Sequence, residues 1–342
     1  MRILCCKPAQ DFLFLYRQEK KMKYYLAPME GITNYIYRRT YHQYFTPADK
    51  YFTPFINPHT TRSLNSKEKK DILPENNEGM YTVPQILTNQ AEDFVRVAKA
   101  LREYGYEEVN LNLGCPSGTV VSKKKGAGFL EFPTRIDHFL EETFEELEPL
   151  GIKVSVKTRL GMLEADEFDQ LLQVYNKYPL HELIIHPRVR TDYYKNTVDL
   201  DAFEKALKAS KNPVCYNGDI FTVQDFEGWQ KRFPEVENVM VGRGLIANPG
   251  LIDKLRTGEI MDKQKLKAFH DQLCSEYMAL KIGDRNVLFK MKELWHYLIC
   301  NFEDAKKQEK AIKKAQTMEK YKEAVNMLFA RCELAEGAGY RA

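Results

Sequence analysis

The sequence predicts a (β/α)8 TIM barrel followed by a small C-terminal helical bundle. Short apolar segments alternate with amphipathic helical patterns, and polar motifs recur where the apolar segments end. The strand pattern then stops, leaving roughly 90 residues with helical spacing only. The chain has 342 residues, 44% of them hydrophobic, which is enough for a large core. We therefore predict a leader (1–21) that is disordered or not native, a barrel domain (22–252) and a helical domain (253–342).

Eight segments have the length and apolar character of buried strands. They are Tyr24–Met29, Tyr51–Ile56, Tyr81–Leu87, Val109–Leu113, Lys153–Leu160, Leu183–Arg188, Pro213–Ile220 and Val239–Leu245. The helices between them have ordinary end signals. Asn89 is a candidate cap for a helix that stops at Gly105, and Pro133 can open another. Thr222 and Asp225 have the spacing of a capping box.

The active site of such a barrel lies at the carboxyl ends of its strands. Each polar motif of this sequence lies at or just before a predicted strand end, which is the main physical argument for an enzyme. Cys115 is the most informative residue, because it ends an apolar strand and is held between Gly114 and Pro116. A thiol so placed can act as an acid, a nucleophile or a ligand, or it can be a structural cysteine in a tight turn.

The last two strand ends carry glycine-rich turns, Asn217-Gly218-Asp219 and Gly242-Arg243-Gly244. In many barrels the loops after strands 7 and 8 hold a phosphate with backbone N–H groups and a basic side chain. Simple structural turns are the competing interpretation. Because no G-x-G-x-x-G motif follows any predicted strand, a Rossmann dinucleotide site is disfavoured, and a mononucleotide phosphate such as that of FMN fits better.

Three further residues at strand ends are candidates for the site. Lys157 interrupts an apolar strand; it could offset negative charge on a reduced flavin, form a Schiff base or make a salt bridge. His186 is either a satisfied core histidine or a site residue, and the neighbouring Arg188 favours a site. No His, Cys and Asp cluster has metal-ligand spacing, so we predict no metal.

Composition limits the remaining possibilities. The formal net charge of +3 does not by itself indicate a nucleic-acid partner. Seven cysteines without paired spacing suit a reducing cytoplasm, and no run of about 20 apolar residues predicts a membrane span. Near the C-terminus, Lys306, Lys310, Lys313 and Lys320 fall on one side of a predicted helix. This face is either simply solvated or a contact for nucleic-acid phosphates.

Several motifs, in order and with fitting spacing, together resemble the tRNA-dihydrouridine synthase family over about residues 24–250. They are Leu26–Thr33, Asn110–Pro116, Lys123–Leu130, Val156–Gly161, Ile185-His186, Asn217–Ile220 and Val241–Gly244. The Asn-x-Gly-Cys-Pro block and the Lys-Gly-Ala-Gly turn after it are the most specific; the others are shared with other flavin barrels.

The resemblance implies FMN on the barrel, uridine in tRNA as substrate, and NADPH or NADH as the reductant of the flavin. Hydride would pass from reduced FMN to C6 of the uracil, and Cys115 would protonate C5. The residues expected to bind the cofactor are Pro28, Met29, Glu30, Gln85, Lys157, His186, Asn217, Gly218, Asp219, Gly242 and Arg243. Those expected to bind the substrate are Asn112, Arg188, Lys306, Lys310 and Lys313. We expect a cytoplasmic monomer that is not bound to a membrane.

Two segments leave questions open. The family pattern of Gly or Ala and then Arg-Thr after the histidine is replaced by Pro187–Asp192, so the position of the reduced uridine is not predicted. The polar segment Asn57–Gly79 has no assigned role. An FMN barrel that acts on a free pyrimidine, similar to a dihydroorotate dehydrogenase, and a non-enzymatic RNA-binding protein are the alternatives.

Overall fold

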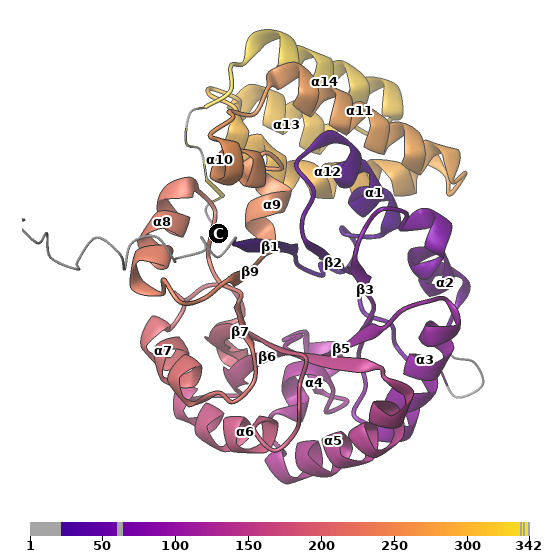
Figure 1. Cartoon of the computed structure of the whole chain (residues 1–342). Helices are drawn as coiled ribbons and strands as arrows, with labels where there is room; N and C mark the ends of the chain where they lie inside the picture. Colours follow the sequence, from indigo (N-terminus) through magenta and orange to yellow (C-terminus); the bar gives the residue numbers. More distant parts are fainter. Residues whose placement is uncertain (1–21, 60–63, 336, 338, 341–342) are drawn as a thin grey trace, which may run out of the picture.

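The structure is a computed structural model that describes residues 22–59, 64–335, 337 and 339–340. The predicted leader, 1–21, lies outside the described residues. Within the described part, nine parallel strands form one barrel sheet in the order β3-β2-β1-β9-β8-β7-β6-β5-β4 (Figure 1). The strands are β1 Lys23–Leu26, β2 Lys50–Phe52, β3 Thr82–Val83, β4 Gln85–Ile86, β5 Glu108–Leu113, β6 Lys153–Gly161, β7 Glu182–Val189, β8 Val214–Tyr216 and β9 Asn238–Val241. The predicted barrel is confirmed.

The third predicted strand is two strands, because Pro84 interrupts it. Proline has no N–H to donate to a sheet ladder. β3 pairs with β2, whereas β4 pairs with β5 on the other side. The carbonyl of Pro84 still accepts a hydrogen bond from the Asn110 N–H, at 2.9 Å. The segment Thr82–Ile86 therefore connects the two ends of the strand order, since it pairs with β2 on one side and with β5 on the other.

The eighth predicted strand is too long, since Val239–Leu245 ends as a helix. β9 stops at Val241, and α9 spans Arg243–Ala247. Gly242 has φ −103° and ψ −98°, outside the strand conformation, and its carbonyl accepts the N–H of Leu245 at 3.0 Å. The glycine-rich turn thus leads directly from strand end to helix start.

Helices cover the outside of the barrel (Figure 1). They are α1 Tyr35–Tyr44, α2 Ser66–Ile72, α3 Ala91–Glu103, α5 Pro133–Leu147, α6 Phe168–Tyr175, α7 Leu200–Ala209, α8 Val223–Arg232 and α10 Leu251–Thr257. The short α4, Gly118–Val121, lies instead in the loop that follows β5. The capping box of Thr222 and Asp225 is confirmed, as is Pro133 at the start of α5. The predicted cap Asn89 is wrong: Gln90 precedes α3, and the Asn89 amide instead donates to the carbonyls of Lys123 and Lys124.

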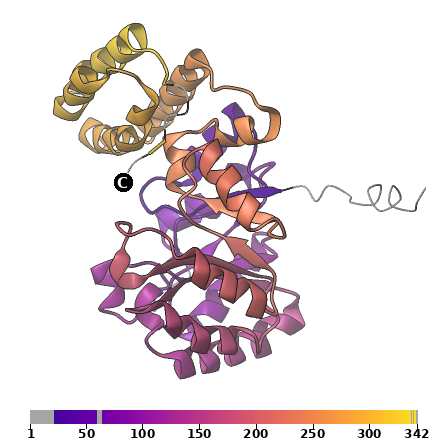
Figure 2. The same cartoon turned by 90° about the vertical axis from the view of Figure 1, so that its left-hand side faces the viewer.

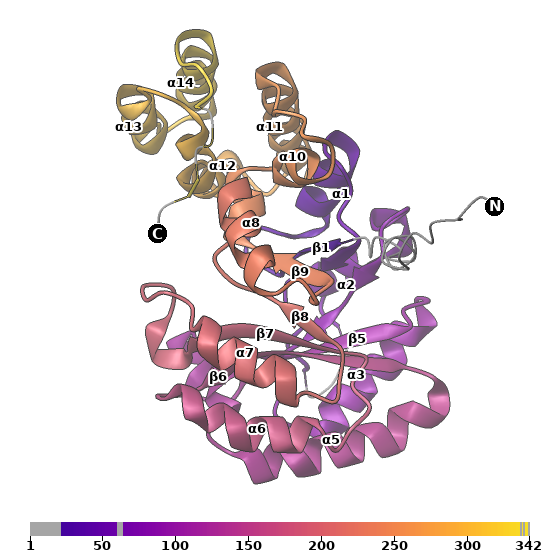
Figure 3. The same ribbon diagram turned by 60° about the vertical axis from the view of Figure 1, so that its left-hand side comes forward.

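Four helices of the described residues form the C-terminal bundle: α11 Lys263–Ala279, α12 Asp284–Leu298, α13 Lys306–Lys314 and α14 Met318–Arg331. The bundle stands over one side of the barrel, against α1 and α9 (Figures 1, 2 and 3). The Tyr277 hydroxyl donates to Asn34 Oδ1 at 3.1 Å, and Lys290 Nζ donates to the Gly31 carbonyl at 3.2 Å. The predicted boundary at 252/253 falls within α10. No described helix is both long and apolar enough to cross a membrane.

The amino-terminal end of the barrel is filled by a buried polar cluster. Lys50 Nζ lies 3.0 Å from Glu108 and 3.5 Å from Glu182. The hydroxyl of Tyr25 donates to Glu182 at 3.0 Å, and that of Tyr81 donates to Glu108 at 3.0 Å. Because each carboxylate has several donors, the cluster closes this end, as expected for a barrel whose chemistry takes place at the other end.

Candidate active site

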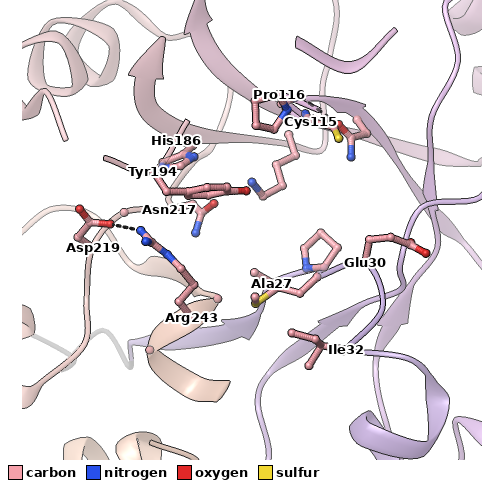
Figure 4. A pocket seen from close by; sticks show the side chains of 18 of the residues that line it. Ala27, Glu30, Ile32, Cys115, Pro116, His186, Tyr194, Asn217, Asp219 and Arg243 are labelled. Atoms are coloured by element: carbon pink, nitrogen blue, oxygen red, sulfur yellow. Dashed lines mark hydrogen bonds and ion pairs between the residues drawn. The ribbon is translucent and has the colours of Figure 1, made fainter. Parts of the chain in front are cut away.

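A cavity of about 590 Å³ opens at the carboxyl ends of the strands (Figure 4). This volume lies within the range of about 300–1,000 Å³ that is usual for small-molecule sites. The cavity is lined by every residue that the sequence assigned to the cofactor, and by Asn112 and Cys115. These residues come from different strand ends, which the closed barrel brings to one place.

Cys115 is held by its backbone from two sides. Asn112 Oδ1 accepts the N–H groups of both Gly114 and Cys115, each at 3.0 Å. The Cys115 carbonyl accepts the N–H of Ala127, also at 3.0 Å. The residue therefore sits in a tight turn, as the structural interpretation predicted, but it also lines the cavity (Figure 4).

Gly126 makes this support possible. Its φ of +56° is a conformation that side chains other than glycine rarely adopt. A Cβ atom at this position would lie 2.9 Å from the Cys115 carbonyl oxygen and 3.0 Å from the Cys115 Cβ. The Lys-Gly-Ala-Gly turn is thus needed for close backbone contact behind the cysteine.

The thiol of Cys115 is kept protonated. Burial raises the pKa of Cys115 above its ordinary value; a backbone hydrogen bond at Ser117 and the charges of Arg159 and Lys157 oppose this effect. A protonated thiol at neutral pH is suited to give a proton, whereas a nucleophile would need the thiolate.

A chain of hydrogen bonds fixes the amides beside the cysteine. Asn112 Nδ2 donates to Gln85 Oε1 at 2.7 Å, and Gln85 Nε2 donates to Asn110 Oδ1 at 2.8 Å. Asn110 Nδ2 then donates to Ser155 Oγ at 3.0 Å, and Ser155 Oγ donates to Glu108 Oε1 at 2.9 Å. The chain ends in the cluster at the base of the barrel, so each amide has one orientation.

Lys157 is a cation without an anion. Within the described residues it makes no ion pair or hydrogen bond, so the predicted salt bridge is not found there. Burial, together with the nearby charge of Arg159, lowers the pKa of Lys157 to about 8. Such a group favours a negatively charged ligand next to it.

Asp219 joins two arginines at the other end of the cavity. Arg243 Nη2 lies 2.7 Å from Asp219 Oδ1, and Arg188 Nη1 donates to the same oxygen at 2.9 Å. Figure 4 shows Arg243 pointing toward Asp219, beside Tyr194. Two guanidinium groups and one carboxylate leave a net charge of +1, which suits one further anion.

Arg188 lies behind the cavity wall instead of facing the cavity. Its side chain is buried, and it donates to the carbonyl of Asn196 and to His186 Nε2, the latter at 3.0 Å. Burial, together with the charges of Arg159, Lys157 and other cations, holds the pKa of His186 well below its ordinary value. A neutral His186 that accepts at Nε2 carries its proton on Nδ1.

Glu30 and the lysines of the bundle lie at the edge of the site or away from it. The Glu30 carboxylate pairs with Lys67 at 3.1 Å. Lys306, Lys310 and Lys313 are exposed on α13 and do not line the cavity. The prediction that they share one helix with Lys320 is wrong, because α13 ends at Lys314 and Lys320 belongs to α14.

Sequence reasoning did not assign several residues of the cavity wall to the site. Among them are Phe55, Tyr194, Phe221, Glu293, Tyr297 and Tyr340. Tyr194 lies a few residues after the predicted strand Leu183–Arg188. An aromatic residue so close to a strand end could have indicated a contact with the site. The last three come from the helical region and reach the cavity only through tertiary packing.

These features define a class of protein: a barrel with a thiol and a cationic pocket at the carboxyl ends of its strands. The chain belongs to the dihydrouridine synthase family, whose model, "Dihydrouridine synthase (Dus)", matches residues 25–333.

Two relatives illustrate the sequence similarity. A "Probable tRNA-dihydrouridine synthase" of Staphylococcus aureus (strain COL) is 29% identical over 241 residues, 67% of this chain and 70% of the relative. A "Probable tRNA-dihydrouridine synthase 2" of Bacillus subtilis (strain 168) is 26% identical over 272 residues, 76% of this chain and 82% of the relative.

Solved structures with a similar barrel are more distant in sequence. Histamine dehydrogenase from Rhizobium sp. 4-9 matches with a TM-score of 0.52 and 11% identity, over 69% of this chain and 46% of that chain. Morphinone reductase matches with a TM-score of 0.51 and 12% identity, over 70% of this chain and 87% of that chain. At such low identities the likeness concerns the fold alone.

Proposed function

We propose that the protein reduces specific uridines of tRNA to 5,6-dihydrouridine, with FMN on the barrel and NADPH or NADH as the reductant. The observation that carries this proposal is one cavity that is lined by both the Cys115 thiol, whose pKa is raised, and the amino group of Lys157. Family membership and the names of the relatives support the same reaction.

Residues of the cavity suit both the phosphate and the ring of FMN. For the phosphate, Arg243 belongs to the cluster with net charge +1, and it also begins α9, whose first N–H groups lie beside that cluster. For the ring, Lys157 offers a positive charge, and Gln85 and Asn217 line the same cavity. When bound, reduced FMN supplies the hydride for C6 of the uracil.

In the proposed reaction the protein itself supplies a proton and holds the substrate in place. The Cys115 thiol gives its proton to C5, so that the C5=C6 double bond becomes saturated, and the thiolate then regains a proton from water. Asn112 Oδ1 already accepts two backbone N–H groups, and one N–H of its amide goes to Gln85. Asn112 therefore contacts the base through its remaining N–H, which suits a uracil carbonyl oxygen.

Three exposed lysines of α13 are proposed to contact the phosphates of the tRNA: Lys306, Lys310 and Lys313. Arg188, predicted to bind substrate directly, is instead proposed to position Asp219 and His186, because its guanidinium is buried and engaged by these residues. The free-pyrimidine alternative is disfavoured because α12 of the bundle supplies Glu293 and Tyr297 to the cavity wall. A cytoplasmic location and a monomeric state remain predictions.

Two measurements test the proposal. The purified protein should show flavin absorption bands, and the reduced enzyme should form dihydrouridine in unmodified tRNA, detected by nucleoside analysis. Flavin bands with reduction of a free pyrimidine but not of tRNA would favour the alternative enzyme. A protein that binds tRNA but no flavin would contradict the proposed reaction.

A further inference from the structure

Described residues after α14 contact both the bundle and the barrel. Leu334 forms an antiparallel bridge with Phe302, and the Ala335 N–H donates to the Asn301 carbonyl at 2.8 Å. Gly339 then lies against the loop between β8 and α8, where a Cβ atom would be only 2.6 Å from Thr222 Cγ2. Glycine is therefore needed for this close approach.

Next to Gly339, Tyr340 lines the cavity and joins the bundle to the barrel. Its hydroxyl lies 3.2 Å from His296 Nε2, and its ring centre lies 5.1 Å from that of Tyr297. On the barrel side, the ring centre lies 5.8 Å from that of Phe221. These contacts hold the Tyr340 ring in one place at the cavity wall.

The Tyr340 ring is the third aromatic ring around Arg243. The guanidinium carbon of Arg243 lies 4.8 Å from the ring centre of Tyr194, 5.2 Å from that of Phe221 and 5.9 Å from that of Tyr340. Cation–π contacts use the flat faces of a guanidinium and leave its in-plane N–H groups available to an anion. One of these N–H groups is used by Asp219. Surrounding rings thus restrict the orientation of Arg243 and leave donors for a phosphate.

We propose that Tyr340 is a positioning residue, which holds the Arg243 guanidinium in the orientation that binds the phosphate of FMN. The inference rests on the proposed function, because it takes FMN as the ligand. It adds that a residue outside the barrel, beyond α14, contributes to binding of the cofactor phosphate.

The test compares two flavins that differ only in the phosphate. Full-length Tyr340→Ala, Tyr340→Phe and wild-type proteins are freed of flavin, and their affinities for FMN and for riboflavin are measured by flavin fluorescence. Tyr340→Ala should bind FMN about three- to tenfold more weakly, the range expected for one cation–π contact. Its affinity for riboflavin should equal that of wild type. Tyr340→Phe keeps the ring and should bind FMN like wild type.

Phe289→Ala is the matched control, since Phe289 is an aromatic residue of α12 that is 60% exposed and outside the cavity. It should change neither affinity. An equal loss for both flavins in Tyr340→Ala would mean general loosening of the site and would overturn the positioning role, as would unchanged FMN affinity. If the wild-type protein binds neither flavin, the proposed function itself fails, so the two failures are distinct.

Discussion

Replacement of Lys157 by methionine should make the flavin-free protein more stable at neutral pH. Burial lowers the Lys157 pKa from its ordinary 10.5 to about 8, which corresponds to about 3 kcal/mol against the charged form in the folded state. Methionine has a similar length and no charge to desolvate. We therefore expect Lys157→Met to raise the free energy of unfolding at pH 7 by about 1–3 kcal/mol.

The pH dependence has a definite sign. Below pH 8 the lysine is protonated in both the folded and the unfolded chain. The folded wild-type protein is therefore destabilised by the full free energy of burying the charge. Between pH 8 and 10.5 the folded state releases its proton first, and wild-type stability rises relative to the variant. Urea unfolding of flavin-free protein at pH 7 and pH 9.5 should show the difference shrinking at the higher pH.

With FMN bound, the same substitution should make the flavin harder to reduce. If an anionic reduced ring offsets the cost of the buried cation, loss of about 3 kcal/mol corresponds to about 60 mV in a two-electron potential. Reductive titration against a reference dye measures this shift, and the potential of Lys157→Met should be the more negative one.

Lys153→Met is the control, because Lys153 starts the same strand but is exposed and pairs with Glu107 at 3.2 Å. It should alter neither the pH dependence nor the potential. The reasoning is refuted if Lys157→Met differs from wild type by the same free energy at both pH values and its potential lies within about 10 mV of wild type.

Three further outcomes are expected. Cys115→Ala should keep FMN but reduce uridine about 10²–10⁴-fold more slowly in single turnover, as for loss of a general acid; wild-type rates would exclude this role. Arg243→Ala should lose FMN on dialysis more than Lys157→Ala, since a charge-assisted phosphate contact contributes about 1.5–3 kcal/mol; equal flavin-to-protein ratios would contradict this. In the last variant, three lysines of α13 are replaced by Gln: Lys306, Lys310 and Lys313. The slope of log affinity for tRNA against log salt concentration should become shallower by about 0.9 per lost contact, with flavin content unchanged. An unchanged slope would place the RNA surface elsewhere.

The positions of the strands could be predicted because their signals are local. A buried parallel strand reads as a short apolar run, and polar residues follow at its carboxyl end. Errors arose where a local signal had more than one meaning. Pro84 inside an apolar run splits the strand, and Asn89 can cap a helix but is used to hold the turn at Lys123 and Lys124. Helix α2 was missed in the segment 57–79 because its sequence, Ser66–Ile72, is mostly charged and lacks an apolar stripe.

The candidate site was predictable to the extent that it is built from strand ends. Cys115 follows a predicted strand, Lys157 and Arg243 lie within predicted strands, and all three line the cavity. The partners of Arg188 were not predictable, since its ion pair with Asp219 joins β7 to the loop after β8. Residues of the helical region reach the cavity through packing between distant segments, for which the sequence pattern of a single helix holds no signal.

Docking of the bundle changes the charge of the cavity as well as its shape. α12 is anchored where Lys290 donates to the Gly31 carbonyl, and the Glu293 carboxylate then lies over Gly31, whose Cβ position is 3.6 Å from both carboxylate oxygens. Arg243 and Lys157 line the same cavity. A phosphate would be repelled by Glu293 and attracted by these two cations, whereas N–H and O–H groups of a nucleoside can donate to the carboxylate. The bundle therefore adds a negative charge to a cavity whose barrel residues include these cations, and we expect this charge to favour a bound nucleotide whose phosphate lies away from Glu293.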